Sequence, residues 1–286
     1  MESNPSHGRA AAPVAPYIGG KRNLARRLVA IIEAIPHRTY AEPFVGMGGI
    51  FLRRPTPAKV EAINDISGDV TTLFRILQRH YQSFMDELKW RLSSRAEFER
   101  LMRVDPETLT DLERAARFLY LQKTAFGGKV AGRSFGVDSR SPSRFDLLKL
   151  APMLAEVHER LSPVTIERLP YADFIRRYDH DETLFYLDPP YWGCETDYGE
   201  GVFAPDDFDR LAEQLAGIKG AFVLSINDTL GARKAFGEFL IEEVETTYTI
   251  ATASAGAGKR VGELIVSNRP LTLGKTPEPA PRGTAA

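Results

Sequence analysis

Residues 40–65, YAEPFVGMGGIFLRRPTPAKVEAIND, contain two strand-like runs separated by a glycine-rich turn. Apolar patterning predicts the strands over 40–44 and 59–64, with a short helix-like run at 50–53. Glycines at a strand-to-helix turn let the backbone approach a ligand where side chains would collide. Open sheets bind nucleotides at this place, beyond the carboxyl ends of their strands. A turn of this kind is about as often a tight connection, so it indicates a ligand site only together with other signals.

The alternation of short apolar runs and helical patterns continues on both sides of this stretch. Helical stripes cover residues 23–35, 70–88, 206–216 and 228–240, and further strand-like runs lie at 164–169, 183–187 and 221–226. Such alternation is typical of a mostly parallel sheet covered by helices. The last two predicted strands, 242–250 and 261–268, have no helix between them. The sequence therefore predicts an α/β protein whose sheet ends in an antiparallel hairpin.

Residues 84–150 depart from this rhythm. They hold one predicted helix, which begins at the capping box Thr110–Glu113 and ends near Leu121. The basic, glycine-rich segment 125–144 follows. A long polar segment inside a compact domain is usually functional or mobile, so we interpret 84–150 as an insert. Residues 1–16 and 271–286 are rich in small residues and proline and lack periodicity, and we expect them to be unstructured tails.

Composition restricts the class of protein. The 286 residues are 43% hydrophobic and 26% charged, which is ordinary for a soluble globular chain. The single cysteine, Cys194, excludes an internal disulfide framework and multi-cysteine metal sites, and indicates an intracellular protein. No segment is apolar enough for a secretory signal or a membrane span. The five histidines lack the spacing of metal ligands, so we expect no metal.

The net charge of −1 conceals an uneven distribution along the chain. Residues 9–38 and 123–149 are basic, whereas residues 179–213 are acidic. Contacts to phosphate depend on the local potential, so a nucleic-acid partner remains open. The alternative is that these charges lie on solvated faces of helices and loops.

Two acidic residues follow predicted strands. Asp65 ends the strand over 59–64, where a carboxylate can accept hydrogen bonds from both hydroxyls of a ribose; a helix cap or turn residue is equally consistent. Asp188-Pro-Pro-Tyr191 follows the strand over 183–187. Its prolines fix the backbone and carry no N–H groups, so carbonyls at the strand tip stay free to accept hydrogen bonds from a ligand. A plain turn is the alternative interpretation.

Together, EPFVGMGG at 42–49, Asp65 and DPPY at 188–191, preceded by Tyr17-Ile-Gly-Gly-Lys21, resemble the Dam-type (class D12) DNA adenine N6-methyltransferases. The resemblance extends from about residue 17 to 268. It implies a Rossmann-like methyltransferase domain over 17–83 and 151–270, with 84–150 as the target-recognition insert. It also implies S-adenosylmethionine as methyl donor. The cofactor contacts carried over from the family are Tyr17, Lys21, Phe44, Gly46, Gly48, Asp65, Asp173, Phe174 and Asp188.

The chemistry of adenine gives the DPPY motif a role. The exocyclic nitrogen is a poor nucleophile because its lone pair is delocalised into the ring. The Asp188 carboxylate and the Pro189 carbonyl would accept both amino hydrogens and direct the lone pair at the methyl group, while Tyr191 would stack on the base. We therefore predict Asp188, Pro189, Pro190 and Tyr191 as the catalytic residues. A base inside a duplex cannot reach such a pocket and must be flipped out.

Double-stranded DNA is the partner that this resemblance implies, with no membrane contact and a monomer as the simplest assembly, in the cytoplasm of a bacterium or encoded by a phage. The candidate DNA contacts are Lys123, Lys129, Arg133, Arg140 and Arg144. Lys259 and Arg260 in the terminal hairpin are further candidates. At Gly127 the family usually has Asn, so the recognition sequence does not transfer. The alternatives are a cytosine N4 methyltransferase, an inactive DNA-binding protein on the same fold, and methylation of RNA or protein.

Overall fold

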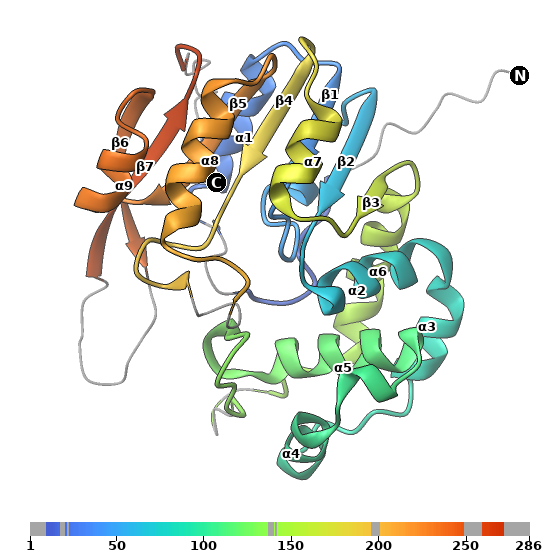
Figure 1. Ribbon diagram of the computed structural model, residues 1–286. Coiled ribbons are helices and arrows are strands. Elements are labelled where there is room, and N and C mark those ends of the chain that lie inside the picture. The colour runs from blue at the N-terminus through green and yellow to red at the C-terminus, as the bar shows by residue number, and fades with distance from the viewer. Residues whose placement is uncertain are drawn as a thin grey trace, which may run out of the picture.

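The computed structural model describes residues 10–271, except 18–20, 22, 137–139, 141, 196–200 and 249–258, and only the backbone of 246–248 and 259–261. Its sheet has the strand order β3-β2-β1-β4-β5-β7-β6 (Figure 1). The strands are β1 (Thr39–Glu42), β2 (Val60–Asn64), β3 (Thr165–Glu167), β4 (Thr183–Leu187), β5 (Ala221–Asn227), β6 (Leu240–Tyr248) and β7 (Lys259–Ser267). The first five run parallel, and β7 is antiparallel to both β5 and β6. The predicted α/β fold with a terminal antiparallel hairpin is therefore confirmed.

Helices cover both faces of the sheet (Figure 1). Successive strand residues point to opposite faces, so Tyr186 enters one core and its neighbours Phe185 and Leu187 enter the other. The first core packs against α1 and a group of five helices, and the second packs against α7, α8 and α9. The helices are α1 (Ala25–Ala34), α2 (Gly68–Arg79), α3 (Tyr81–Leu88), α4 (Arg95–Arg103), α5 (Asp111–Thr124), α6 (Leu147–Leu161), α7 (Tyr171–Tyr178), α8 (Asp206–Ala216) and α9 (Leu230–Ala235).

The segment interpreted as an insert is more helical than its sequence predicts. Helices α4 and α5 lie entirely within 84–150, and α3 and α6 cross its two boundaries. Phe84 and Leu150, at those boundaries, are buried in the same core as the sheet. The helix over 70–88 is interrupted at His80, where φ is −131° and ψ is 34°, and so forms α2 and α3. The five helices α2–α6 gather at the lower right of Figure 1, to one side of the sheet.

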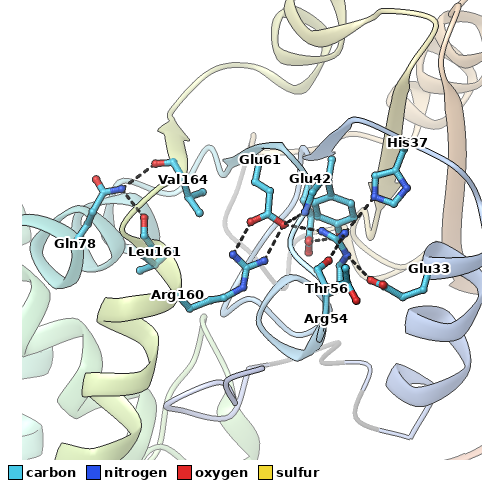
Figure 2. Close-up of polar contacts among 12 residues, drawn as sticks. Glu33, His37, Glu42, Arg54, Thr56, Glu61, Gln78, Arg160, Leu161 and Val164 are labelled. Atoms are coloured by element: carbon cyan, nitrogen blue, oxygen red, sulfur yellow. Dashed lines mark hydrogen bonds and ion pairs between the residues drawn. The ribbon is translucent and has the colours of Figure 1, made fainter. Parts of the chain in front are cut away.

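A buried ionic network joins α6 to the sheet (Figure 2). Arg160 of α6 donates from Nη2 to Oε1 of Glu61 on β2 at 2.8 Å, and Arg54 donates from Nη1 to the same oxygen at 2.8 Å. Arg54 also pairs with Glu33 and lies 3.9 Å from the centre of the Tyr40 ring. Two guanidinium groups thus neutralise one buried carboxylate, which fixes the helical group against β2.

The N-terminal segment differs from its prediction. Residues 10–16 were expected in an unstructured tail, yet Ala11, Val14 and Ala15 are buried in the core, and Ala11 N–H donates to the carbonyl of Leu52 at 2.8 Å. Small apolar side chains can enter the core without a periodic pattern, which explains why periodicity missed them.

Candidate active site

A cavity of about 1080 Å³ opens at the carboxyl ends of β1, β2 and β4. Cavities of this size accommodate cofactor-sized ligands. Most of the residues predicted to contact the cofactor line it, although they come from four separate stretches of the chain. Those lining it are Tyr17, Lys21, Phe44, Gly46, Asp65 and Asp188, and Pro190 joins them.

The glycine turn after β1 has the backbone that its sequence requires. Gly46 has φ of +50° and Gly48 has φ of +73°, a region that L side chains rarely adopt. A Cβ on Gly46 would lie 3.0 Å from the Tyr17 ring, and one on Gly48 would lie 2.8 Å from Leu52. The turn therefore needs glycine for its backbone conformation and for close packing, although Gly48 does not line the cavity.

Asp65 is held by the backbone of this turn. Its two carboxylate oxygens accept from the N–H groups of Gly46 and Ser67, each at 2.9 Å. Burial raises the pKa of Asp65 to about 6, and these two N–H groups oppose the rise. Each carboxylate oxygen keeps acceptor capacity for a further donor, as the expected ribose contact requires.

Ala12, Pro13, Ala15, Pro16 and Tyr17 form one wall of the cavity, and the end of α5 fixes this segment. Gln122 Nε2 donates to the carbonyls of Pro16 and Gly128, at 2.8 and 2.6 Å. Lys123 Nζ donates to the carbonyl of Val14 at 3.1 Å. The insert therefore positions Tyr17, whose phenol pKa is raised well above its usual value by burial and by the nearby Asp65 charge.

Three aromatic rings form another wall. The centre of the Phe44 ring lies 5.5 Å from that of Tyr171 and 6.0 Å from that of Phe203. Tyr171 and Phe203 line the cavity, but sequence reasoning missed both. It selected Asp173 and Phe174 instead; Asp173 pairs with Arg176 on the surface, and Phe174 is buried in the second core. The residues here that line the cavity are Leu169, Pro170 and Tyr171, at and just before the start of α7.

Asp188, directly after β4, is paired with Lys21. Lys21 Nζ lies 3.0 Å from Asp188 Oδ1 and 2.6 Å from the hydroxyl of Tyr191, and its side chain is fully buried. Burial raises the pKa of Asp188 to about 6, while Lys21 opposes that rise. Pro189 and Pro190 are buried. Asp188 and Pro190 of the DPPY motif line the cavity, whereas Pro189 and Tyr191 do not, and Tyr191 packs against Lys21.

The loop after DPPY is fastened to β5. The Asn227 side chain accepts from the N–H of Trp192 at 2.8 Å and donates to its carbonyl at 3.0 Å. The Trp192 ring stacks on Phe208 with centres 4.6 Å apart. This amide pair fixes the backbone next to Tyr191.

Three of the five predicted DNA contacts also hold parts of the protein, and Arg144 does so by donating from Nη1 to the carbonyl of Ala125 at 3.3 Å. Lys123 holds the N-terminal segment, and half-buried Arg133 donates to Gln122 Oε1 at 3.0 Å. Lys129, Arg140 and Arg144 are exposed, as a DNA-facing surface requires. The side chains of Lys259 and Arg260 lie outside the described residues.

Sequence reasoning also missed Glu263 of β7, whose side chain is fully buried and contacts Lys21 and Tyr191. The signal was present, because a carboxylate inside the apolar run VGELIV is unusual unless it is paired.

Within the described part of the chain, no cluster of three or more His, Cys, Asp or Glu side chains could hold a metal ion. No helix among those residues has the length and apolar character to cross a membrane.

A mostly parallel sheet of this strand order, with a glycine turn after β1, an acid after β2 and a terminal antiparallel hairpin, defines a Rossmann-like methyltransferase. The chain belongs to the D12 class of N6 adenine-specific DNA methyltransferases, and the model of that family matches residues 17–250.

Individual relatives agree with the family. The type II methyltransferase M.CviBI of Paramecium bursaria Chlorella virus NC1A is 24% identical over 260 residues, covering 90% of this chain and 99% of its own. A DNA adenine methylase of Vibrio cholerae is 27% identical over 267 residues, covering 87% and 93%. Among solved structures, a putative class I S-adenosylmethionine-dependent methyltransferase from Listeria monocytogenes matches with 10% identity and a TM-score of 0.38, covering 97% of this chain and 66% of its own. That likeness is too weak to add to the assignment.

Proposed function

We propose that this enzyme transfers a methyl group from S-adenosylmethionine to N6 of an adenine flipped out of duplex DNA. The observation that carries the proposal is that Asp188 and Pro190 of DPPY line the same cavity as the glycine turn and Asp65, with Lys21 paired to Asp188. We place this activity in the cytoplasm, where the DNA of a bacterium or a virus is accessible.

The residues of the cavity suit the cofactor. Phe44, Tyr171 and Phe203 offer an aromatic slot for its adenine, and Asp65 offers oxygens for its ribose hydroxyls. Gly46 and the Tyr17 ring that packs on it line the same cavity, so the cofactor can approach the backbone of the glycine turn there. When bound, S-adenosylmethionine supplies an electrophilic methyl group on sulfur. Asp173 and Phe174 have no part in this arrangement.

Asp188 and Pro189 act on the target amino group. The Asp188 carboxylate and the Pro189 carbonyl accept its two hydrogens and leave the nitrogen lone pair directed at the methyl group. Pro190 keeps this segment rigid, and the Tyr191 ring stacks on the base. After transfer, the nitrogen carries positive charge and releases one proton to the Asp188 carboxylate, which passes it to water.

The cavity admits only a base that has left the duplex, at a cost of a few kcal/mol for unstacking and unpairing. Lys129, Arg140 and Arg144 on the insert are the exposed cations that support this by binding phosphate. Lys123 and Arg133 contribute indirectly, because they hold the wall and loop on which the site depends.

The test is to incubate the purified protein with unmethylated DNA and S-adenosylmethionine labelled in its methyl group, and then to digest the DNA to nucleosides. Label in N6-methyl-2′-deoxyadenosine supports the proposal, and label in N4-methyl-2′-deoxycytidine contradicts it. Tight DNA binding without label and without cofactor binding by calorimetry would instead identify an inactive DNA-binding protein. Competition with RNA and protein substrates tests the nucleic-acid class.

A further inference from the structure

Glu263 is a buried carboxylate that the proposed mechanism does not use. It lies on β7 opposite Asn227, the last residue of β5, and its exposed fraction is 0%. It is not among the residues that line the cavity. A buried charge of this kind is costly unless it is paired and hydrogen-bonded. The partners of Glu263 therefore indicate its role.

Those partners are Lys21, which pairs with Asp188, and Tyr191, the last residue of DPPY. The Tyr191 hydroxyl donates to Glu263 Oε1, and Lys21 Nζ lies 3.4 Å from Glu263 Oε2. Lys21 Nζ also lies 4.0 Å from the centre of the Tyr191 ring. One carboxylate from the C-terminal strand thus contacts both the ring that would stack on the base and the ammonium that pairs with the catalytic acid.

The charges around Lys21 explain why a second carboxylate is needed. With Glu263 present, the ammonium faces two carboxylates, those of Asp188 and Glu263. Lys21 then stays in place when an Asp188 oxygen turns to the amino group of the base. Without Glu263, the ammonium would have Asp188 as its one remaining carboxylate partner among the described residues, and would compete with the substrate for it.

We infer that Glu263 is a positioning residue for methyl transfer: it fixes the Tyr191 ring through its hydroxyl and holds Lys21, so that Asp188 is free to accept from the target amino group. This inference rests on the proposed function. It assigns Glu263 to the base-binding side of the site and not to cofactor binding.

The groups that face this cluster come from several strands. Asp188 follows β4, Tyr186 lies on β4, Ser225 lies on β5, and Glu42 lies on β1. Burial raises the pKa of Glu42 well above its usual value, and the Tyr40 hydroxyl that donates to Glu42 opposes this rise. The negative charge of Glu263 acts on Asp188 in the direction that raises the Asp188 pKa.

The test compares Glu263→Gln and Glu263→Ala with the wild type and with Glu243→Gln, which removes an exposed carboxylate from the neighbouring strand β6. We expect kcat for DNA to fall by about 10- to 100-fold in both Glu263 variants, more in the alanine variant, because small misplacements at a reacting centre cost about this much. The dissociation constant for S-adenosylmethionine, from calorimetry, should change by less than about threefold. Glu243→Gln should match the wild type.

Two further readouts separate positioning from a structural defect. The acid limb of the kcat profile should move to lower pH in Glu263→Gln, because Asp188 loses a neighbouring negative charge. Glu263→Gln should also cost less in a Tyr191→Phe background, in which its donor is gone.

Several results would overturn the inference. Wild-type kcat in Glu263→Gln would do so, as would a loss of kcat accompanied by an equal loss of cofactor affinity and an unmoved pH profile. If the wild type itself methylates no adenine, the proposed function fails instead, and the two failures are therefore distinguishable.

Discussion

The surroundings of Asp188 have two opposite effects on the pKa of its carboxyl group. Burial disfavours its charge, Lys21 favours it, and burial wins, so its pKa rises to about 6. A base with a pKa near the working pH is ionised when the amino group arrives and can still take up the released proton. This arrangement lowers the free energy of unfolding, since a raised pKa means that the ionised carboxylate is less stable in the folded chain than in the unfolded one.

Replacing Asp188 by Asn should therefore abolish activity without loosening the fold. We expect kcat to drop by about 10²- to 10⁴-fold, the usual loss for a group that transfers a proton in the reaction. The melting temperature at pH 8 should be equal to or above that of the wild type, because a disfavoured buried charge is removed. Methyl transfer and thermal unfolding measure the two effects, with Asp209→Asn on the exposed face of α8 as control. An active Asp188→Asn would contradict the mechanism.

The pH dependence has opposite signs for activity and stability. Activity needs ionised Asp188, so kcat at saturating cofactor should rise with pH through about 6 and be about tenfold lower at pH 5. Because the folded pKa lies above the usual 3.8, the stability that the bound proton contributes is fully present below 3.8 and is lost as pH rises through 6.

The pKa of Asp65 is also raised to about 6. The affinity for the cofactor should therefore weaken as the pH falls through about 6, because a protonated Asp65 is a poorer acceptor. Calorimetry at each pH separates that effect from kcat. A kcat that stays flat between pH 5 and 8 at saturating cofactor would argue against Asp188 as the acceptor.

At the scale of elements, the link between α6 and β2 determines whether the helical group stays on the sheet. Arg160 and Arg54 both pair with Glu61 out of solvent, and the Arg160 guanidinium lies 4.1 Å from the centre of the Phe51 ring (Figure 2). Breaking such a pair leaves an incompletely compensated buried charge, whereas replacing all partners with apolar groups costs far less.

Arg160→Met should lower the free energy of unfolding by about 3 kcal/mol, measured by urea denaturation. Adding Glu61→Gln should recover part of that loss, since the carboxylate that needed Arg160 is then gone. Arg176→Met, which breaks an exposed pair with Asp173, should cost no more than about 1 kcal/mol. Equal losses for the buried and the exposed pair would refute this account.

The sequence predicted the strands of the sheet and the helices with clear apolar stripes, and the capping box at Thr110 is confirmed with both of its hydrogen bonds. It did not predict α4, α6 or α7. Charged residues dilute the apolar pattern of α4, Pro152 interrupts that of α6, and α7 has only two buried side chains, Phe174 and Ile175. Each of these helices is stabilised by tertiary packing, which periodicity does not report.

The residues of the site also differ in whether the sequence could predict them. Asp65, Asp188 and the glycine turn were predictable because each is local to the end of one strand. The partners of Glu263 and Gln122 were not predictable, since they lie 72 and 106 residues away in the chain at Tyr191 and Pro16. Only the folded topology brings those segments together.

For the whole molecule, a net charge of −1 is compatible with a DNA enzyme because basic residues outnumber acidic ones locally, as over 123–149. Lys129, Arg140 and Arg144 are exposed on the segment that follows α5 and contacts the N-terminal wall of the cavity. Gly128 packs against Pro16 and Tyr17 of the cavity wall, so its neighbour Lys129 lies beside the proposed site, and we expect Arg140 and Arg144 to extend the phosphate-binding surface from there.

Replacing any of these three residues by Ala should weaken DNA binding and reduce the slope of log affinity against log salt by about 0.9 for each phosphate that the variant no longer binds. Fluorescence anisotropy across a salt series measures this. The matched control is Lys219→Ala, because Lys219 is exposed and precedes the amino-terminal end of β5, whereas the cavity lies at the carboxyl ends of the strands. If Lys219→Ala changes the slope as much as the three insert variants do, the DNA does not bind at the insert.

The placement of β7 between β5 and β6 has a consequence for synthesis of the protein. A nascent chain emerging from the ribosome makes β6 before the strand that joins it to the sheet, so β5 and β6 both keep open edges until β7 follows. Products of premature termination before β7 would retain those edges, which favour aggregation, and would lack Glu263. Under the positioning role inferred for Glu263, the complete site forms only after β7 has been synthesised.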